Sequence, residues 1–396
     1  MAKKNAPGAQ VAGFIPLCVP EIRGNEWTYI KECLDTNWIS SVGEYVNRFE
    51  AEMAAYLGSA RAIAVVNGTA GLHVALLASG VGPDDEVLVP PLTFVAPVNA
   101  IRYCNAWPVF MDVEPSTWQM DIAKLATFLE KECTSVDGHL VNRNTHRRIR
   151  ALLPVHILGH PVDMDPLLDL AGRYDLVLVE DATEGLGARY KGRMIGTLGD
   201  IAVLSFNGNK LISTGGGGMI VTNDAALADY AKYLTTQAKD DPLEYIHNEI
   251  GYNYRLTNVL AAIGVAQLEQ VEAYIAAKRH IASRYRTGLH DVPGITLPVE
   301  ADWAFHTFWL YTILVEDAEF GMDSRALLRS LGEAGIQARP LWHPIHSLPP
   351  YSEAQAYRIE VADWLYERAL SIPCSVGLSD TEQDRVIATI RARARA

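Results

Sequence analysis

The chain has 396 residues, of which 49% are hydrophobic, and a formal net charge of −13. This length suits two domains, and the composition is sufficient for a large buried core. The acidic balance disfavours nucleic acid or an anionic membrane surface as the main partner, and the sequence lacks the run of about 18 apolar residues that a membrane-spanning helix needs.

The five cysteines are scattered and form no CxxC pair, which is typical of reduced thiols. Residues 1–13 contain basic residues but no apolar core of signal-peptide length, so we expect a disordered leader. Together these features predict a cytoplasmic protein, and we expect no metal site.

The first elements are two helices, expected over residues 20–35 and before Gly58. A short buried strand at 62–66 then runs into Asn67-Gly68-Thr69-Ala70 and an apolar helix. Asn67 or Thr69 is a suitable N-cap. Free N–H groups and the helix dipole would make this turn an anion site, although an ordinary capped helix gives the same pattern.

Strands and helices alternate over the next hundred residues. Strands are expected at 86–90, 108–113, 152–156 and 176–180, with helices at 93–104 and 166–174. Continuous apolar strands separated by helices predict an α/β domain with a mostly parallel sheet covered on both faces. Ligands in such sheets bind at the carboxyl ends of the strands.

The strand at 176–180 leads directly into Asp181. A buried carboxylate is costly unless it meets a cation, and a protonated ring nitrogen would serve. A helix-capping aspartate at a strand end is the alternative. Glu184, three residues further on, could face the same ligand from the next turn.

Lys210 lies between two short apolar runs, with Ser205 five residues before it and the glycines 215–218 beginning five residues after it. A lysine among small residues can be approached by a flat ligand, and desolvation would free its amine lone pair. The alternative is a glycine-rich turn between strands with a solvated lysine.

The remainder of the chain has a different pattern. Residues 237–254 are irregular and polar, and a long helical stretch follows, bent or broken near residue 274. Beyond it a strand at 309–315 and further helices predict a smaller α+β domain. We therefore expect a large domain over residues 14–255 and a small one over 256–396.

Four features in chain order fit one ligand. They are an anion site at Gly68 and Thr69, an aromatic ring at Phe94, an acid at Asp181 and a lysine at Lys210. Pyridoxal 5′-phosphate (PLP) needs an anchored phosphate, a stacked ring, a partner for its pyridine nitrogen and an aldehyde-capturing lysine.

The chain also resembles a known family along about residues 14–380. The matching segments are IPLCVPEIRGNEW, TNWISSVG, VVNGTAGLHVAL, PPLTFVAPVNAI, LPVHILGHPVDMDP, VEDATEGLGA, SFNGNKLISTGGGGMIVT, GYNYRLTNVLAAIGVAQLE, RPLWHPIHSLPPY and SIPCSVGL. In this order they resemble the DegT/DnrJ/EryC1/StrS nucleotide-sugar aminotransferases. These have the fold-type I, aspartate aminotransferase-like architecture.

The resemblance implies roles for individual residues. Lys210 would capture the cofactor's aldehyde and then carry the transferred proton, and Asp181 would keep the pyridine nitrogen protonated. Phe94 would stack on the ring, and Glu184 would lie near the ring hydroxyl, where many relatives have Gln. The phosphate would be held by Gly68, Thr69 and Ser205.

The resemblance also implies a homodimer with shared sites, in which Asn253 reaches the phosphate bound by the neighbouring subunit. Substrate contact is implied more weakly for Arg255, Trp309, His346 and Tyr351. Glutamate would donate the amino group, and a ketone on a nucleotide-linked sugar would receive it.

One departure bears on the substrate. Most of the family reads T-G-E-G-G after the lysine, whereas this chain has Thr214 followed by four glycines. The run resembles the subgroup that aminates UDP-linked 4-keto-6-deoxy N-acetylhexosamines, so that substrate is expected. The related 3-dehydratases have His at the position of Lys210, which favours transamination here.

Other interpretations stay open. The same machinery could act on a GDP-linked 4-keto sugar of the perosamine type, a 3-keto sugar or a cyclitol ketone. The protein could instead be a non-catalytic, cofactor-binding regulatory relative. An α/β enzyme without PLP is a third alternative, although no Walker or GxGxxG spacing follows an expected strand.

Overall fold

The computed structural model describes residues 13–395, and its centre is an eight-stranded sheet. The strand order is β1 (Arg61–Val65), β11 (Gly218–Thr222), β10 (Ile201–Ser205), β7 (Val177–Asp181), β6 (Ile149–Leu152), β2 (Glu86–Val89), β3 (Trp107–Met111) and β16 (Ala356–Tyr357). β11 pairs antiparallel with β1 and β10, and the other neighbours in this sheet pair parallel. The mostly parallel α/β sheet expected from the sequence is confirmed.

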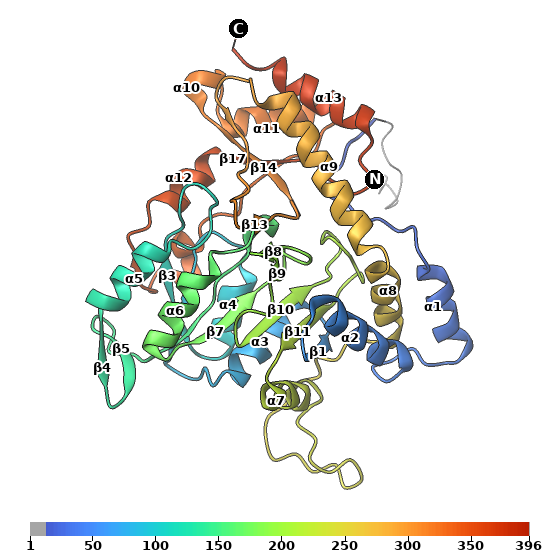
Figure 1. Cartoon of the computed structure of the whole chain (residues 1–396), viewed down its shortest axis with the longest axis vertical. Coiled ribbons are helices and arrows are strands. Elements are labelled where there is room, and N and C mark those ends of the chain that lie inside the picture. Colours follow the sequence, from blue (N-terminus) through green and yellow to red (C-terminus); the bar gives the residue numbers. More distant parts are fainter. Residues whose placement is uncertain (1–12, 396) are drawn as a thin grey trace, which may run out of the picture.

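Helices cover both faces of this sheet (Figure 1). Alternate strand residues bury on opposite faces: Ala202 and Leu204 on one, Ile201 and Val203 on the other. The first face packs against α2 (Glu44–Leu57), α5 (Ile122–Lys131), α6 (Met164–Tyr174) and α8 (Asn258–Leu268). The second packs against α3 (Gly68–Ala78), α4 (Ala96–Tyr103) and α7 (Ala225–Thr235). Burial on both sides explains why these strands are apolar throughout.

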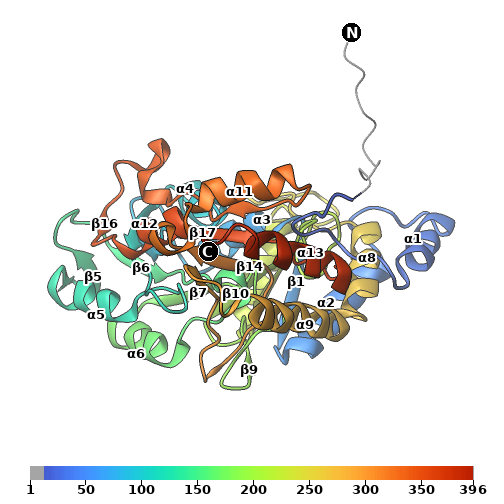
Figure 2. The ribbon, with the colours of Figure 1, turned by 90° about the horizontal axis from the view of Figure 1, so that it is seen from above.

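A second, antiparallel sheet is built from the C-terminal part of the chain, drawn in orange and red in Figures 1 and 2. Its order is β12 (Ile295–Thr296), β14 (Tyr311–Val315), β17 (Ala369–Ile372) and β15 (Arg339–Pro340). Its core includes residues of α9 (Val271–Leu289), α11 (Ser324–Glu333), α12 (Val361–Arg368) and α13 (Asp380–Arg391).

Smaller elements complete the described chain. They are α1 (Glu26–Asp35), the hairpin of β4 (Cys133–Val136) and β5 (His139–Asn142), η1 (Ile157–Gly159), β8 (Arg189–Tyr190), β9 (Arg193–Met194), β13 (Ala304–Phe305), α10 (Asp317–Phe320), η2 (Ile345–Ser347) and η3 (Pro349–Tyr351). The β4–β5 hairpin was not expected from the sequence.

The long helical stretch breaks earlier than expected, between Leu268 and Val271, where α8 and α9 meet at 59°. After the break α9 leaves the large sheet: its first turns, at Val271, Tyr274 and Ile275, still pack in the core of that sheet with α8, and its later residues, from Ile281 to Leu289, pack in the core of the second sheet. No single helix among residues 13–395 is long and apolar enough to cross a membrane.

The expected division at residue 255 stays a prediction. α8 follows that residue yet packs with the large sheet, and Asn258 accepts a hydrogen bond from the Tyr45 N–H at 3.0 Å. β16 likewise returns to pair with β3. The expected leader, residues 1–13, lies outside the described residues except for Gly13.

Candidate active site

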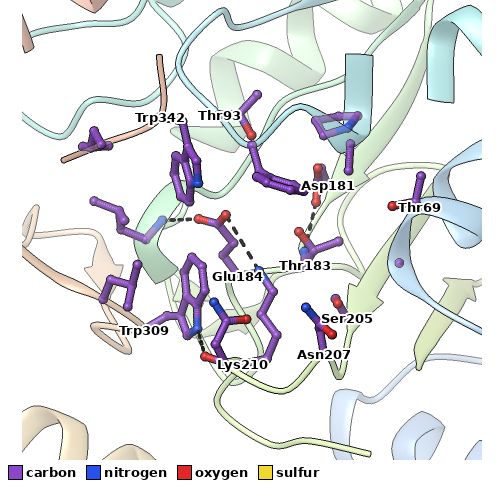
Figure 3. Close-up of a pocket in the computed structure, with 18 of the residues that line it drawn as sticks. Thr69, Thr93, Asp181, Thr183, Glu184, Ser205, Asn207, Lys210, Trp309 and Trp342 are labelled. Atoms are coloured by element: carbon purple, nitrogen blue, oxygen red, sulfur yellow. Dashed lines mark hydrogen bonds and ion pairs between the residues drawn. The ribbon is translucent and has the colours of Figure 1, made fainter. Parts of the chain in front are cut away.

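A cavity of about 380 Å³ opens where the carboxyl ends of several large-sheet strands face the second sheet. Residues far apart in sequence meet there: Asn67, Gly68 and Thr69 after β1, Thr93 and Phe94 after β2, Asp181, Thr183 and Glu184 at β7, Ser205, Asn207, Asn209 and Lys210 after β10, and Trp309, Arg339, Trp342 and Ser371 from the C-terminal part. Figure 3 shows ten of the lining residues labelled. The position agrees with the rule for ligand sites in parallel sheets.

One end of the cavity is built to hold an anion. Asn67 caps α3, and its side chain accepts a hydrogen bond from the Ala70 N–H at 2.8 Å. The first N–H groups of α3 therefore lie beside the hydroxyls of Thr69 and Ser205. A Cβ on Gly68 would lie 3.0 Å from Ser205 Cβ and 3.2 Å from Thr183 Cγ2, so glycine keeps this cradle open.

The central acid is Asp181, which is 1% exposed at the end of β7. The Thr183 N–H donates to its Oδ1 at 3.1 Å. Burial raises the pKa of Asp181, and the hydrogen bonds from Thr183 oppose that rise. A cationic N–H bound beside this carboxyl would favour its ionised form.

Lys210 lies on the opposite wall, with a nearly buried side chain. Its Nζ is 3.8 Å from Glu184 Oε1 and 3.8 Å from the centre of the Trp309 ring. Burial lowers the pKa of Lys210, while Glu184 and Asp181 oppose the change. A buried amine with a lowered pKa can act as a nucleophile and as a base.

Glu184 is held in place by the backbone. The Leu158 N–H donates to Glu184 Oε2 at 2.8 Å, and Leu158 adopts a left-handed conformation, with φ 60°, to present it. Such strain commonly persists at functional sites. Burial raises the pKa of Glu184 to about 7, although the Lys210 ammonium lowers it in part.

Aromatic rings form the other end of the cavity (Figure 3). Trp309 and Trp342 stack with ring centres 6.2 Å apart and planes 11° from parallel, and Phe94 lies edge-on to Trp342 at 6.5 Å. The Trp309 Nε1–H donates to the Asn209 carbonyl at 2.7 Å, which fixes its ring over Lys210.

Sequence reasoning missed the support behind Asp181. His156 Nδ1 accepts from the Val162 N–H at 3.1 Å, so its Nε2–H donates to Glu180 at 2.9 Å. Glu180 also accepts backbone hydrogen bonds from Gly196, Leu198 and Gly199. This network anchors the residue immediately before Asp181. VEDATEGLGA and LPVHILGHP are separate segments, so no local pattern could have indicated the contact.

The other four candidates do not line this cavity. Asn253 and Arg255 line a different cavity of about 320 Å³ with Ser41, Thr236, Gln237 and Lys239. His346 contacts Phe110 and lies 3.7 Å from Asp363, and the Tyr351 hydroxyl donates to Asn99. The structure therefore gathers Gly68, Thr69, Phe94, Asp181, Glu184, Ser205, Lys210 and Trp309, and does not bring His346 or Tyr351 to the cavity.

The residues present fit PLP. The glycine cradle and hydroxyls suit a phosphate, Asp181 suits a protonated ring nitrogen, and Lys210 suits an aldehyde. The cavity volume lies within the usual range for small-molecule sites.

Comparisons with known proteins agree with this geometry. The chain belongs to the DegT/DnrJ/EryC1/StrS aminotransferase family, whose model matches residues 20–391. It is 40% identical to GDP-perosamine synthase of Caulobacter vibrioides over 95% of this chain and 97% of the relative. It is also 40% identical to GDP-perosamine synthase of Escherichia coli O157:H7, over 93% and 95%.

A solved aminotransferase of the same family from Brucella abortus superimposes with a TM-score of 0.85. It is 27% identical, and the match covers 94% of this chain and 96% of that structure. The protein is thus a PLP-dependent, fold-type I aminotransferase of nucleotide sugars. The non-catalytic and PLP-free interpretations are set aside.

Each of the pocket residues has a separate expected role in transamination. Bound PLP supplies an electrophilic aldehyde and an electron-withdrawing ring. Asp181 would hold the charge on the ring nitrogen, and the α3 turn would hold the phosphate. Lys210 Nζ would accept and return the transferred proton, and its lowered pKa would make the neutral amine accessible. Glu184 and the Trp309 ring lie where they would position that amine.

Proposed function

We propose that the protein moves the amino group of L-glutamate onto the C4 ketone of a GDP-linked 4-keto-6-deoxyhexose. The pocket supports the reaction class, because Lys210, Asp181 and the α3 cradle face one cavity. The nucleotide and sugar are supported by one observation: the 40% identity to two GDP-perosamine synthases over almost their full length. Their names point to a GDP-linked amino sugar as product.

This proposal replaces the UDP-N-acetylhexosamine substrate expected from the four-glycine run. A Cβ at Gly216 would meet no atom within 4 Å, so the backbone here does not require glycine in place of the glutamate common at this position. Gly216 is also not among the residues that line the cavity. The glycine run therefore carries little information about the substrate.

A substrate panel tests the proposal. Purified enzyme with PLP and glutamate is offered a GDP-linked 4-keto-6-deoxyhexose, a UDP-linked 4-keto-6-deoxy-N-acetylhexosamine and a 3-keto nucleotide sugar. We expect kcat/KM to favour the GDP-linked ketone by about 100-fold or more. Preference for the UDP-linked ketone would restore the first expectation, and the product's mass and NMR spectrum would identify the aminated carbon.

We further propose a homodimer with shared sites, as the resemblance implies. Asn253 and Arg255 face a cavity that the residues of the PLP pocket do not line. Leu243, Tyr245 and Ile250, on the nearby irregular segment, are between 70% and 85% exposed in the single chain. Such apolar exposure is typical of a surface that another protein covers. Light scattering should give twice the 43.5 kDa chain mass.

A further inference from the structure

A buried lysine that the transamination chemistry does not use lies behind the PLP pocket. Lys278, on α9, is 1% exposed. Its ammonium donates to the Trp309 carbonyl at 2.9 Å and to the Cys374 carbonyl, and it lies 3.6 Å from the sulfur atoms of both Cys18 and Cys374. None of the ion pairs found within residues 13–395 gives this ammonium a carboxylate.

A buried ammonium is costly without a negative charge beside it. The polar groups around Lys278 Nζ are two carbonyl oxygens and two sulfur atoms, so a thiolate is the group that can supply this charge. Cys18 is the partly exposed member of the pair, whereas Cys374 is buried.

The backbone holds the two cysteines together. The Cys374 N–H donates to the Leu17 carbonyl at 2.7 Å, and the Val19 N–H donates to the Ser375 hydroxyl at 3.1 Å. Residues 17–19 and 374–375 therefore lie side by side. All five cysteines are free in this structure.

We propose that Cys18 is a lysine-stabilised thiolate that peroxides oxidise, with Cys374 as the second thiol that completes a disulfide. The Cys18 sulfur attacks a peroxide oxygen, the O–O bond breaks, and Cys18 becomes a sulfenic acid while hydroxide leaves. The Cys374 sulfur then attacks the Cys18 sulfur, and hydroxide leaves with the thiol proton as water. Two thiols lose two electrons, and hydrogen peroxide becomes two waters.

The electrostatics agree with this assignment of roles. A hydrogen bond from Cys374 lowers the pKa of Cys18 to about 6, burial opposes the change, and the charges of Lys278 and, less strongly, Lys210 add to it. The same hydrogen bond raises the pKa of Cys374, which therefore stays protonated. The Cys18 thiolate, and not Cys374, is then the nucleophile toward peroxide.

Cys18 also contacts Asn209, a residue that lines the PLP pocket. When protonated, the Cys18 thiol can donate to the Asn209 carbonyl at 3.4 Å, the same oxygen that accepts from Trp309 Nε1, and the thiolate loses this hydrogen bond. Asn209, in turn, precedes Lys210. Oxidation at Cys18 would thus alter a contact one residue from the catalytic lysine.

The test uses the cofactor-loaded enzyme and peptide mass spectrometry. We expect iodoacetamide to modify Cys18 at a rate that stays high at neutral pH and falls only below about pH 6. An ordinary thiol, in contrast, becomes reactive only above about pH 8. Hydrogen peroxide should yield a Cys18–Cys374 cross-linked peptide that dithiothreitol removes. Equal pH profiles for Cys18 and an ordinary thiol, or no cross-link, would overturn the proposal.

Variants separate the roles. Lys278→Met should move the Cys18 profile toward higher pH and slow alkylation at neutral pH about tenfold, while Lys31→Met, an exposed control on α1, should not. If Lys278→Met does not fold, Cys374→Ser decides: its hydroxyl can still donate a hydrogen bond to Cys18 but cannot form a disulfide, so the variant should lack the cross-link and leave a Cys18 sulfenic acid that dimedone traps. Absence of dimedone labelling there would contradict the sequence of steps.

Discussion

Lys210 Nζ and Glu184 Oε1 face each other across 3.8 Å in the pocket, although β8, β9 and β10 separate them in the chain. Glu184 is buried and Lys210 nearly so, and burial moves their pKa values in opposite directions, up for Glu184 and down for Lys210. Both shifts bring the two pKa values closer together, which suits a lysine expected to accept and return a proton.

Replacing Lys210 by Ala should abolish turnover. We expect kcat to fall by about 1000-fold or more, because the variant lacks both the aldehyde-binding amine and the proton carrier. Steady-state assays with glutamate and the best nucleotide sugar measure this loss. Lys191→Ala, which removes an exposed lysine, is the control and should keep normal turnover. Near-normal turnover of the Lys210 variant would refute its role.

Glu184 should make stability depend on pH. Its native carboxyl keeps a proton to about pH 7, whereas the unfolded carboxyl has the ordinary pKa of 4.5. The native state then binds more protons between these values, so the free energy of unfolding falls as pH rises through this window, by roughly 3 kcal/mol. Urea denaturation of cofactor-free protein at several pH values measures the fall.

In Glu184→Gln this contribution should disappear, because the amide does not ionise. The exposed Glu130→Gln on α5 should leave the pH dependence unchanged. An identical fall in wild type and Glu184→Gln would show that another group is responsible.

Gly68→Ala should weaken cofactor binding. The added methyl group would press against Ser205 and Thr183 in the space assigned to the phosphate. We expect the Kd for PLP to rise about tenfold or more, measured by spectroscopic titration. Gly172→Ala on α6 is the matched control, since its Cβ meets no atom within 4 Å. Equal affinity of both variants would remove Gly68 from the phosphate site.

Gly216→Glu should leave the substrate preference unchanged. The first carbon of the side chain would meet no atom within 4 Å, and Gly216 does not line the cavity. The ratio of kcat/KM values for GDP- and UDP-linked ketones should stay within about twofold of wild type. A large change in that ratio would mean that the glycine run does select the substrate.

Shared sites predict complementation between inactive variants. Lys210→Ala and Asn253→Ala each damage both sites of their own dimer. A mixed dimer with shared sites regains one intact site, which carries the Lys210 of one subunit and the Asn253 of the other. Random subunit exchange should restore about one quarter of wild-type activity. No recovery after demonstrated exchange would show that each site belongs to one chain.

The sequence predicts the parts of this site that follow strand ends. Asp181 ends a continuous apolar strand, and Asn67 precedes a helix, so local pattern and chain order placed both correctly. Long-range contacts could not be predicted in this way. His156 hydrogen-bonds to Glu180 on a neighbouring strand. Lys278 contacts Cys374, although 96 positions separate the two residues in the sequence.

The resemblance implied substrate contact for His346 and Tyr351. In the single chain both pack against Phe110, the Tyr351 hydroxyl donates to Asn99, and neither lines the PLP pocket, so their role stays a prediction. Residue type and position in a motif did not reveal which way these side chains point, because tertiary packing decides it.

The visible absorption spectrum of the purified protein, recorded before and after glutamate, tests the central claim most directly. PLP held by Lys210 should give a yellow band that is absent in Lys210→Ala and that bleaches when glutamate is added. A wild-type protein that stays colourless with added PLP, or a band that glutamate leaves unchanged, would contradict the assignment of Lys210 and of glutamate as the amino donor.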